Sequence, residues 1–198
     1  PVIVSTGMAT ETEIEDTVKT LIDSGCKQYA LLKCTSSYPA DPKNSNVLTI
    51  PDLKKQFKCI VGLSDHTMGI GAAIAAISHG AKIIEKHFTL DRKDGGVDSA
   101  FSLQPEEMKL LVKESINAWQ SLGKVSYGPT DSEKGSLKFR RSLYVSKDMK
   151  KSEIFTKENL RIVRPGYGLE PKYYDKVLGK RTNVNLNIGD KLRKKNIN

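Results

Sequence analysis

Two histidines stand where a chemical role is expected. His66 and His87 each follow a short apolar run of the kind that forms a buried strand. Imidazole is a common ligand of transition metals, so two such side chains on neighbouring strands could converge on one ion. The alternative is that His66 caps the following helix and that His87 is only a hydrogen-bonded residue at a strand end. The third histidine, His79, falls inside a helical pattern and is expected to be structural or exposed.

Other polar residues gather at the same kind of position. Four apolar runs end in stretches rich in Ser, Thr, Asp and Glu, at residues 5–8, 34–39, 62–67 and 85–89. In parallel α/β folds the carboxyl ends of the strands meet at one edge of the sheet, where active sites form. The pattern therefore predicts a site at this edge. No G-x-x-x-x-G-K-[ST] loop is present, so nucleotide binding of that type is not supported.

The elements that must position these residues alternate along the first 123 residues. Short apolar runs indicate strands, and apolar residues about 3.6 positions apart indicate amphipathic helices, the first of them capped by Thr10 or Thr12. Such an order predicts parallel strands with right-handed crossovers, in a β/α barrel or a doubly wound sheet. The expected strands are 2–4, 29–34, 59–63 and 82–88, and the expected helices are 11–24, 50–57, 70–78 and 104–122.

Four strand–helix units amount to half of a (β/α)8 barrel, or TIM barrel. A half barrel has open sheet edges, and the chain begins at Pro1 inside an expected strand. We therefore expect a piece of a longer protein, in which residues 1–123 form the C-terminal half of the barrel.

The rest of the chain has a different texture. Residues 124–138 are polar and contain Gly128-Pro129, which indicates a linker. Residues 139–198 show two short strand patterns, at 141–145 and 160–164, a short helical turn at 157–160, and frequent glycines. We expect a small β-rich domain, whose core would be marginal on its own at this size.

Positive charge is concentrated in this second part. The net charge is +9, and the chain from Lys124 onward holds 19 of the 32 Lys and Arg but only 8 of the 23 Asp and Glu. One interpretation is a non-enzymatic module that binds a polyanion or polysaccharide, and the other is a solvated basic surface. Binding by charge alone predicts basic residues interleaved with aromatic ones. The polar groups gather at strand ends instead, so we expect no nucleic-acid partner.

The cysteines and the hydropathy restrict which disulfides, zinc sites and membrane segments the chain can form. Cys26, Cys34 and Cys59 have no paired spacing and form no C-x-x-C, which argues against a disulfide framework and a zinc site. No apolar run approaches the roughly 20 residues that span a bilayer. We expect free thiols, no membrane segment and a cytoplasmic protein.

Several longer strings resemble one family. LLKCTSSYP at 31–39, GLSDHT at 62–67, IIEKHFTLDR at 83–92 and DGGVDSAFS at 94–102 resemble, in this order and spacing, the sialic acid synthase family. The strings RRSLYV at 140–145 and IVRPG at 162–166 resemble the antifreeze-like (SAF) domain that follows the barrel in this family. The resemblance covers essentially the whole chain.

The resemblance implies the C-terminal half of a TIM barrel, a linker and a small SAF domain of the β-clip type. It also implies a domain-swapped homodimer, in which each SAF domain covers the barrel of the partner. The implied reaction condenses phosphoenolpyruvate with an amino-sugar aldehyde and releases phosphate. The implied cofactor is a divalent metal, Mn²⁺ or Mg²⁺, and His66 and His87 match its histidine ligands.

Further site residues follow from the matching strings. Ser36 and Ser64 fall where the family contacts phosphoenolpyruvate, although some members carry asparagine at position 36. Tyr38 and Asp98 fall where it holds the acceptor sugar, and Asp98 could also shuttle a proton. Arg164 falls where the SAF domain reaches into the partner's site, and its guanidinium could bond an acyl carbonyl.

The string at 94–102 bears on the substrate. It resembles the pseudaminic acid synthases, whose acceptor is 2,4-diacetamido-2,4,6-trideoxy-L-altrose. N-acetylneuraminate and legionaminate synthases more often carry a Pro-Gly-Pro-Asp run there, and they are the alternatives within the family. The resemblance also places the lysines that grip phosphoenolpyruvate before Pro1, so we expect this chain alone to be inactive.

Overall fold

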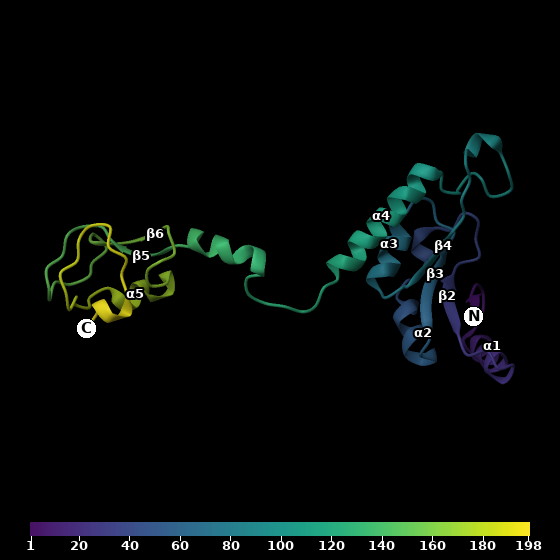
Figure 1. Cartoon of the computed structure of the whole chain (residues 1–198), viewed down its shortest axis with the longest axis horizontal. Helices are drawn as coiled ribbons and strands as arrows, with labels where there is room; N and C mark the ends of the chain where they lie inside the picture. Colours follow the sequence, from purple (N-terminus) through teal and green to yellow (C-terminus); the bar gives the residue numbers. More distant parts are fainter. The chain divides into compact units, whose positions relative to one another are not determined.

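The computed structural model describes all 198 residues, which form two compact units, Pro1–Val125 and Ser126–Asn198 (Figure 1). Each unit has its own hydrophobic core. The two units are therefore described in turn.

The first unit is an α/β domain built on a parallel sheet with the strand order β1-β2-β3-β4. The mixed α/β class and the parallel sheet are confirmed, and the half barrel stays a prediction. The elements are β1 (Val2–Ser5), α1 (Glu11–Asp23), β2 (Tyr29–Cys34), η1 (Pro42–Asn44), α2 (Thr49–Phe57), β3 (Ile60–Asp65), α3 (Gly71–Ser78), β4 (Ile83–Lys86), η2 (Arg92–Asp94) and α4 (Pro105–Ser121).

One face of the sheet carries the core of this unit. Leu31, Val61 and Leu63 lie on neighbouring strands and are almost fully buried against side chains from α1, α2 and α3. Burial of a side chain such as Leu31 contributes about 1.5–3 kcal/mol. The helices α2, α3 and α4 lie along the same side of the strands in Figure 1.

The opposite face carries the polar residues. Side chains alternate between the two faces of a strand, so residues two apart share a face. The register aligns Cys34 with Ser64 and Ser64 with Glu85, which places these three side chains in one row facing away from the helices. Continuing each strand by two residues brings Ser36, His66 and His87 into the next row. A glycine below this row is needed at position 62, since an added Cβ would lie 2.2 Å from the carbonyl oxygen of Ile83.

The first helix begins with a reciprocal cap. The Glu13 amide donates to the Thr10 hydroxyl at 3.4 Å, and the Thr10 amide donates to the Glu13 carboxylate at 2.7 Å. These bonds satisfy backbone donors at the helix start. Thr10 is therefore the cap, and Thr12 lies inside the helix.

The second unit contains the two strands that its sequence pattern predicted, within one residue at their ends. β5 and β6 form one antiparallel pair, and isolated bridges such as Met149 with Leu186 connect the loops around it. Buried apolar side chains, Phe155, Leu160 and Leu192 among them, fill its core. Its elements are η3 (Asp131–Phe139), β5 (Ser142–Val145), β6 (Leu160–Val163), η4 (Pro171–Tyr173), α5 (Tyr174–Val177) and η5 (Lys194–Asn196).

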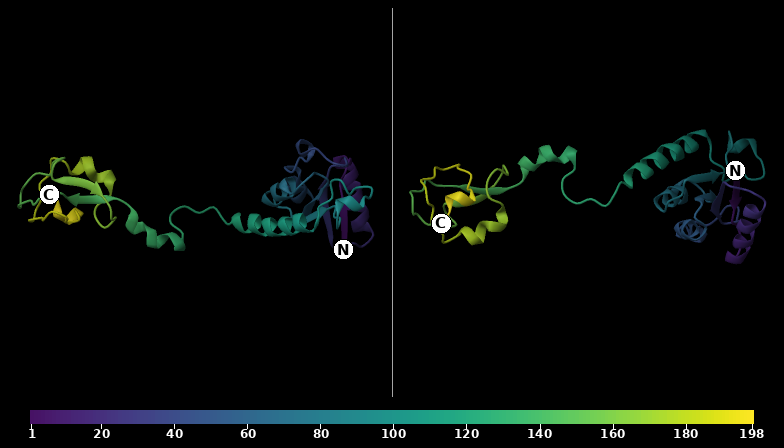
Figure 2. Two further views of the ribbon diagram at one scale, coloured as in Figure 1. Left: turned by 90° about the horizontal axis from the view of Figure 1, so that it is seen from above. Right: turned by 60° about the horizontal axis from the view of Figure 1, so that its bottom comes forward.

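Two local predictions in this part can be compared with the structure. The expected helical turn at 157–160 is confirmed, since the Leu160 amide donates to the Thr156 carbonyl at 3.2 Å, and the turn leads into β6. The expected linker at 124–138 is irregular up to Thr130 and then forms the 3-10 helix η3 (Figure 2). The Thr130 amide donates to the Glu133 carboxylate at 2.8 Å, a capping contact that favours the helix start.

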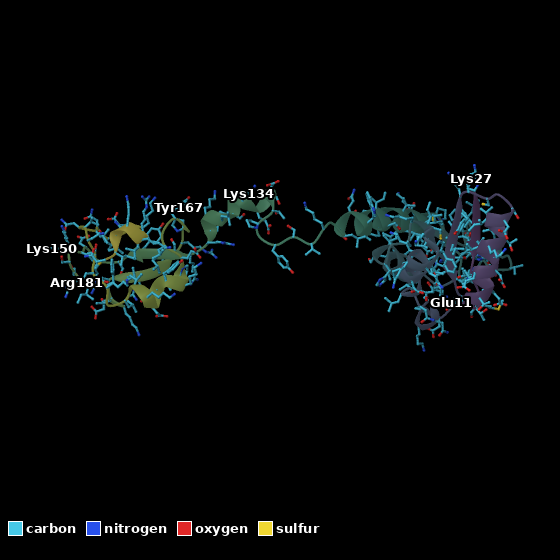
Figure 3. The ribbon with its side chains drawn as sticks, turned by 90° about the horizontal axis from the view of Figure 1, so that it is seen from below. Glu11, Lys27, Lys134, Lys150, Tyr167 and Arg181 are labelled. Carbon is cyan, nitrogen blue, oxygen red and sulfur yellow. The ribbon has the colours of Figure 1, made fainter.

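All three cysteines are free thiols, as predicted. The helices include none that is both long and apolar enough to cross a bilayer. Basic side chains are spread over the second unit, where Lys134, Lys150 and Arg181 are exposed (Figure 3).

Candidate active site

His66 is one of the buried polar groups of the candidate site. Its side chain follows β3 and is 7% exposed. Its Nδ1 lies 2.9 Å from the carbonyl oxygen of Thr35. Because a carbonyl can only accept, Nδ1 carries the proton and Nε2 is left with a free lone pair. His66 does not cap the next helix, since Ile70 is the N-cap of α3.

His87 is oriented by a carboxylate. Its Nδ1 lies 3.5 Å from Oδ2 of Asp98, and both side chains are about one-third exposed. The His66 and His87 rings meet edge to face, with centroids 5.1 Å apart. The family resemblance predicts that Asp98 holds the acceptor sugar, and in the structure Asp98 lies beside a candidate metal ligand.

The two imidazoles fit the role of metal ligands. His66 Nδ1 bonds the Thr35 carbonyl, and His87 Nδ1 lies 3.5 Å from the Asp98 carboxylate, so in each ring Nε2 is the nitrogen left for an ion. A backbone carbonyl or carboxylate behind a ligating histidine is the usual support of a metal site. No group of three or more His, Cys, Asp and Glu side chains is placed to hold an ion, so this chain offers two ligands and not a complete set.

Aromatic rings surround the histidine pair. The centroid of the Tyr38 ring lies 4.2 Å from the centroid of the His66 ring and 6.0 Å from that of the His87 ring. The Phe101 ring lies 5.0 Å from that of His87. Tyr38 is 55% exposed whereas Phe101 is 4% exposed, so Tyr38 forms an open wall and Phe101 a buried support. Sequence reasoning identified Tyr38 and missed Phe101.

The two serines lie close to this cluster in different surroundings. Ser64 is buried, and its hydroxyl donates to Oε1 of Glu85 at 2.7 Å. Ser36 has only a weak contact, 3.9 Å from Oγ to Sγ of Cys34. Its hydroxyl is therefore free to donate elsewhere. Gly7 lies against it, since a Cβ there would be 2.2 Å from the Ser36 oxygen.

A buried ion pair lies behind the histidines. Lys86 Nζ donates to Oδ2 of Asp65 at 2.7 Å, and the two side chains are 2% and 1% exposed. Oδ1 of Asp65 accepts from the Thr67 amide at 2.9 Å, and Lys86 also donates to the Thr67 carbonyl. These bonds fix the turn that follows β3. The sequence analysis did not identify this pair. It could have been found from the two opposite charges, Asp65 and Lys86, that each stand near the end of an apolar strand and are paired in the register of β3 and β4.

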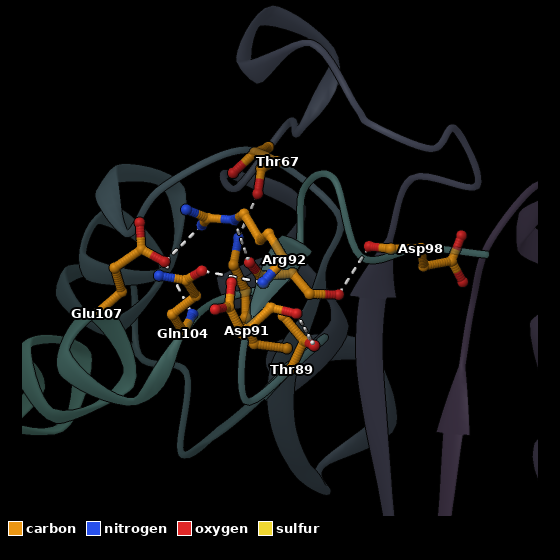
Figure 4. Close-up of polar contacts among 9 residues, drawn as sticks. Thr67, Thr89, Asp91, Arg92, Asp98, Gln104 and Glu107 are labelled. Carbon is orange, nitrogen blue, oxygen red and sulfur yellow. Dashed lines mark hydrogen bonds and ion pairs between the residues drawn. The ribbon is translucent and has the colours of Figure 1, made fainter. Parts of the chain in front are cut away.

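Arg92 lies at the centre of a second polar cluster, in the loop between β4 and α4 (Figure 4). Its Nε donates to the carbonyl of Ser102 at 2.9 Å, and its guanidinium pairs with Glu107. Its amide donates to Oε1 of Gln104 at 3.0 Å. The Gln104 amide, followed by the Arg92 guanidinium, holds the pKa of Glu107 below its ordinary value.

Arg164 belongs to the second unit. It directly follows β6, is exposed, and makes no hydrogen bond or ion pair. The loop behind it is held by Ser142, whose hydroxyl donates to the Pro165 carbonyl at 2.8 Å and accepts from the Gly168 amide at 2.9 Å. Arg164 is thus presented on a fixed loop.

A different cavity lies at the other end of the strands. It has a volume of about 730 Å³ and is lined by residues at the strand starts, including Val2, Tyr29 and Ile60. None of the candidate site residues lines it. Because active sites of parallel sheets form at the carboxyl ends of strands, the histidine end is the better candidate.

Comparison with known families decides the relationship. The NeuB family matches residues 1–127, and the SAF domain matches residues 140–198. The chain belongs to the NeuB family. The resemblance found in the sequence is thereby confirmed.

Relatives within the family are named for the synthesis of different acids. The chain is 43% identical over 196 residues to a pseudaminic acid synthase of Campylobacter jejuni, a match that covers 98% of this chain and 56% of the relative. It is 39% identical over 195 residues to an N,N'-diacetyllegionaminic acid synthase of Campylobacter jejuni, with 97% and 58% covered. The chain spans somewhat more than half the length of these curated relatives.

Solved structures agree with this grouping. The spore coat polysaccharide biosynthesis protein SpsE of Bacillus subtilis matches with a TM-score of 0.59 and 30% identity, over 100% of this chain and 61% of that protein. An N-acetylneuraminic acid synthetase of Leptospira borgpetersenii, solved with citrate, matches with a TM-score of 0.62 and 36% identity, over 70% of this chain and 48% of that protein.

Proposed function

We propose that the protein condenses phosphoenolpyruvate with 2,4-diacetamido-2,4,6-trideoxy-L-altrose to give pseudaminic acid and phosphate. The observation that carries the proposal is the cluster of His66, His87, Asp98 and Tyr38 at the strand ends of a NeuB-family chain. The identity to a pseudaminic acid synthase and the string at 94–102 support this substrate.

The proposed reaction balances as follows. C3 of phosphoenolpyruvate forms a bond to the aldehyde carbon of the sugar, C2 takes the oxygen of a water molecule, and phosphate leaves by cleavage of the C2–O bond. One water proton ends on the new sugar hydroxyl and the other on the phosphate. A divalent cation held by His66 and His87 would supply Lewis-acid chemistry at the aldehyde oxygen.

The side chains of this chain have distinct proposed roles. Ser36, whose hydroxyl is free, donates to phosphoenolpyruvate. Ser64 donates to Glu85 in this structure and would contact phosphoenolpyruvate by turning its hydroxyl away from Glu85. Asp98 holds His87 through Oδ2, and its other oxygen orients an acceptor hydroxyl. Tyr38 packs against the sugar from its exposed position. In a domain-swapped homodimer, Arg164 of one subunit would bond an acyl group in the site of the other.

The test is phosphate release with Mn²⁺, phosphoenolpyruvate and each candidate aldehyde in turn. We propose that this chain alone is inactive, because the phosphoenolpyruvate lysines precede Pro1 in the family. The assay therefore uses this chain fused behind the preceding barrel segment of the Campylobacter jejuni pseudaminic acid synthase, beside the unfused chain. The barrel segment taken from the relative could itself determine which sugar is accepted. A second fusion therefore carries the corresponding segment of the N,N'-diacetyllegionaminic acid synthase.

Phosphate release by both fusions only with the diacetamido-trideoxy-altrose would support the proposal. Release with N-acetylmannosamine or with the legionaminate precursor would keep the reaction and reject the substrate. Turnover by the unfused chain would reject the proposed need for the missing lysines. A polyanion-binding module would release no phosphate in any arm.

A further inference from the structure

Between β4 and α4 the chain makes a long excursion that carries two residues of the candidate site, Asp98 and Phe101. The excursion is closed at its base, where the Leu103 amide donates to the His87 carbonyl and the Thr89 amide to the Leu103 carbonyl, both at 2.9 Å. Between these bonds the chain turns through Gly95 and Gly96, which both have positive φ angles. The side chain of Val97 is fully exposed, so packing does not hold the tip.

Arg92 connects the two ends of this excursion. Its Nε donates to the Ser102 carbonyl at 2.9 Å, its amide donates to Gln104 Oε1 at 3.0 Å, and its guanidinium pairs with Glu107 in the first turn of α4. Figure 4 shows this arrangement, with Arg92 between Glu107 and the segment that carries Asp98. A planar guanidinium can make such diverging bonds at once, whereas an ammonium acts as a point charge.

The bonds continue from Arg92 to the site. Ser102 is buried, and its hydroxyl donates to the carbonyl of Asp98 at 2.7 Å. Asp98 in turn places its carboxylate 3.5 Å from His87 Nδ1. Phe101, next to Ser102 in the chain, packs its ring 5.0 Å from the His87 ring. Fixing Ser102 therefore fixes both neighbours of His87.

We propose that Arg92 is a positioning residue, which fixes the segment Lys93–Leu103 to the start of α4 and so holds Asp98 and Phe101 against the His87 ring. Only the consequence for metal binding rests on the proposed function. The positioning itself is a property of this chain and can be measured without ligand.

The first experiment measures amide hydrogen exchange on this chain and on Arg92→Ala. We expect exchange of the Leu103 and Thr89 amides to accelerate about tenfold or more, because hydrogen bonds from a charged donor to a buried acceptor are lost. Amides of β2 and β3 keep their rates. Arg92→Lys should give an exchange rate between those of the wild type and Arg92→Ala. It keeps a positive charge beside Glu107 but loses the planar guanidinium that bonds Ser102 and Glu107 at once. Lys93→Ala is the matched control, because the exposed Lys93 side chain makes no polar contact.

The second experiment titrates Mn²⁺ alone into the same proteins and measures free Mn²⁺ by electron paramagnetic resonance. We expect Arg92→Ala to weaken binding about tenfold or more, as loss of the support behind a ligand does elsewhere. Lys93→Ala binds like the wild type. If Arg92→Ala loses protection throughout β2 and β3, Glu107→Gln replaces it, and the local loss is expected at the same two amides.

The outcomes separate the two proposals. Unchanged exchange at Leu103 in Arg92→Ala, or in Glu107→Gln where that variant is needed, overturns the positioning role. Faster exchange with unchanged Mn²⁺ affinity also overturns it, because the residue would then stabilise the loop without serving His87. Faster exchange in a protein whose wild type binds no Mn²⁺ supports the positioning of the loop and rejects the metal site of the proposed function.

Discussion

The buried pair of Asp65 and Lys86 allows the most direct test of the packing behind the site. In Asp65→Asn one side-chain oxygen is left for two donors, the Thr67 amide and the Lys86 ammonium, and the charge of Lys86, whose side chain is 2% exposed, is no longer compensated. Removing one partner of a buried ion pair costs about 3–5 kcal/mol, since it leaves an uncompensated charge. A domain of ordinary stability has about 5–15 kcal/mol in total, so this single substitution should remove a large share of the stability of the unit.

The magnitude can be separated into its parts with a second substitution. The pair Asp65→Asn and Lys86→Met removes both charges, and the Asn oxygen can still accept from the Thr67 amide, whose bond to Asp65 is 2.9 Å in the wild type. The remaining cost comes from the unpaired Asn amide and from the Thr67 carbonyl that Lys86 no longer contacts, about 1–3 kcal/mol. The double variant should therefore be more stable than Asp65→Asn alone.

The assay is urea unfolding followed by tryptophan fluorescence. The chain has a single tryptophan, Trp119, and it lies in α4, so the signal reports the first unit without interference from the second. A loss below about 1 kcal/mol in Asp65→Asn, or a double variant no better than the single one, would contradict a buried, mutually dependent pair.

The remaining predictions concern other supports of the two units. Gly62→Ala should cost about 1–3 kcal/mol or more, because its Cβ would lie 2.2 Å from the Ile83 carbonyl oxygen, while Gly71→Ala, with open space around it, should be neutral or stabilising in the same urea assay. Ser142→Ala should cost about 1–3 kcal/mol and accelerate exchange of the Gly168 amide, whereas the exposed Ser136→Ala should change neither. Thr67→Val should be neutral or stabilising by thermal unfolding, since the buried Thr67 hydroxyl has no partner, and a loss above about 1 kcal/mol would reveal a hidden role. The pKa of Glu107 is lower in the folded than in the unfolded chain. The ionised Glu107 carboxylate therefore stabilises the fold above the ordinary glutamate pKa of about 4.3, and this contribution is lost as the pH falls through the folded value. Between about pH 6 and 3 the free energy of unfolding of Glu107→Gln should fall less than that of the wild type.

The helices and strands of the first unit were predictable because their apolar residues repeat with the period of a helix, about 3.6 residues, or of a strand, about two residues. Apolar runs with alternating faces gave the four strands, and β2 has the bounds that the sequence predicted. The bounds of β3 and β4 differ by one or two residues, because strand ends depend on which backbone groups pair and not on hydropathy. The order of the sheet follows from the short connections between consecutive units.

The contacts of the site were less predictable. That Asp65 faces Lys86 depends on the register of β3 against β4, and a shift of one residue would put them on opposite faces. The packing of Phe101 on His87 depends on the path of an irregular loop. The 3-10 helix η3 carried a readable signal in Thr130 and Glu133, but it buries no side chain, and the polar composition favoured a linker.

The histidine pair is the central claim, and the chain supplies its own control. In the fused synthase, His66→Ala, His87→Ala and His79→Ala are assayed for Mn²⁺-dependent phosphate release from phosphoenolpyruvate and the diacetamido-trideoxy-altrose. His79 is exposed at the C-cap of α3, away from the strand ends that hold the other two. We expect His66→Ala and His87→Ala to lose turnover by about 100-fold or more while His79→Ala retains it. Wild-type rates in either of the first two variants would contradict the assignment of this site.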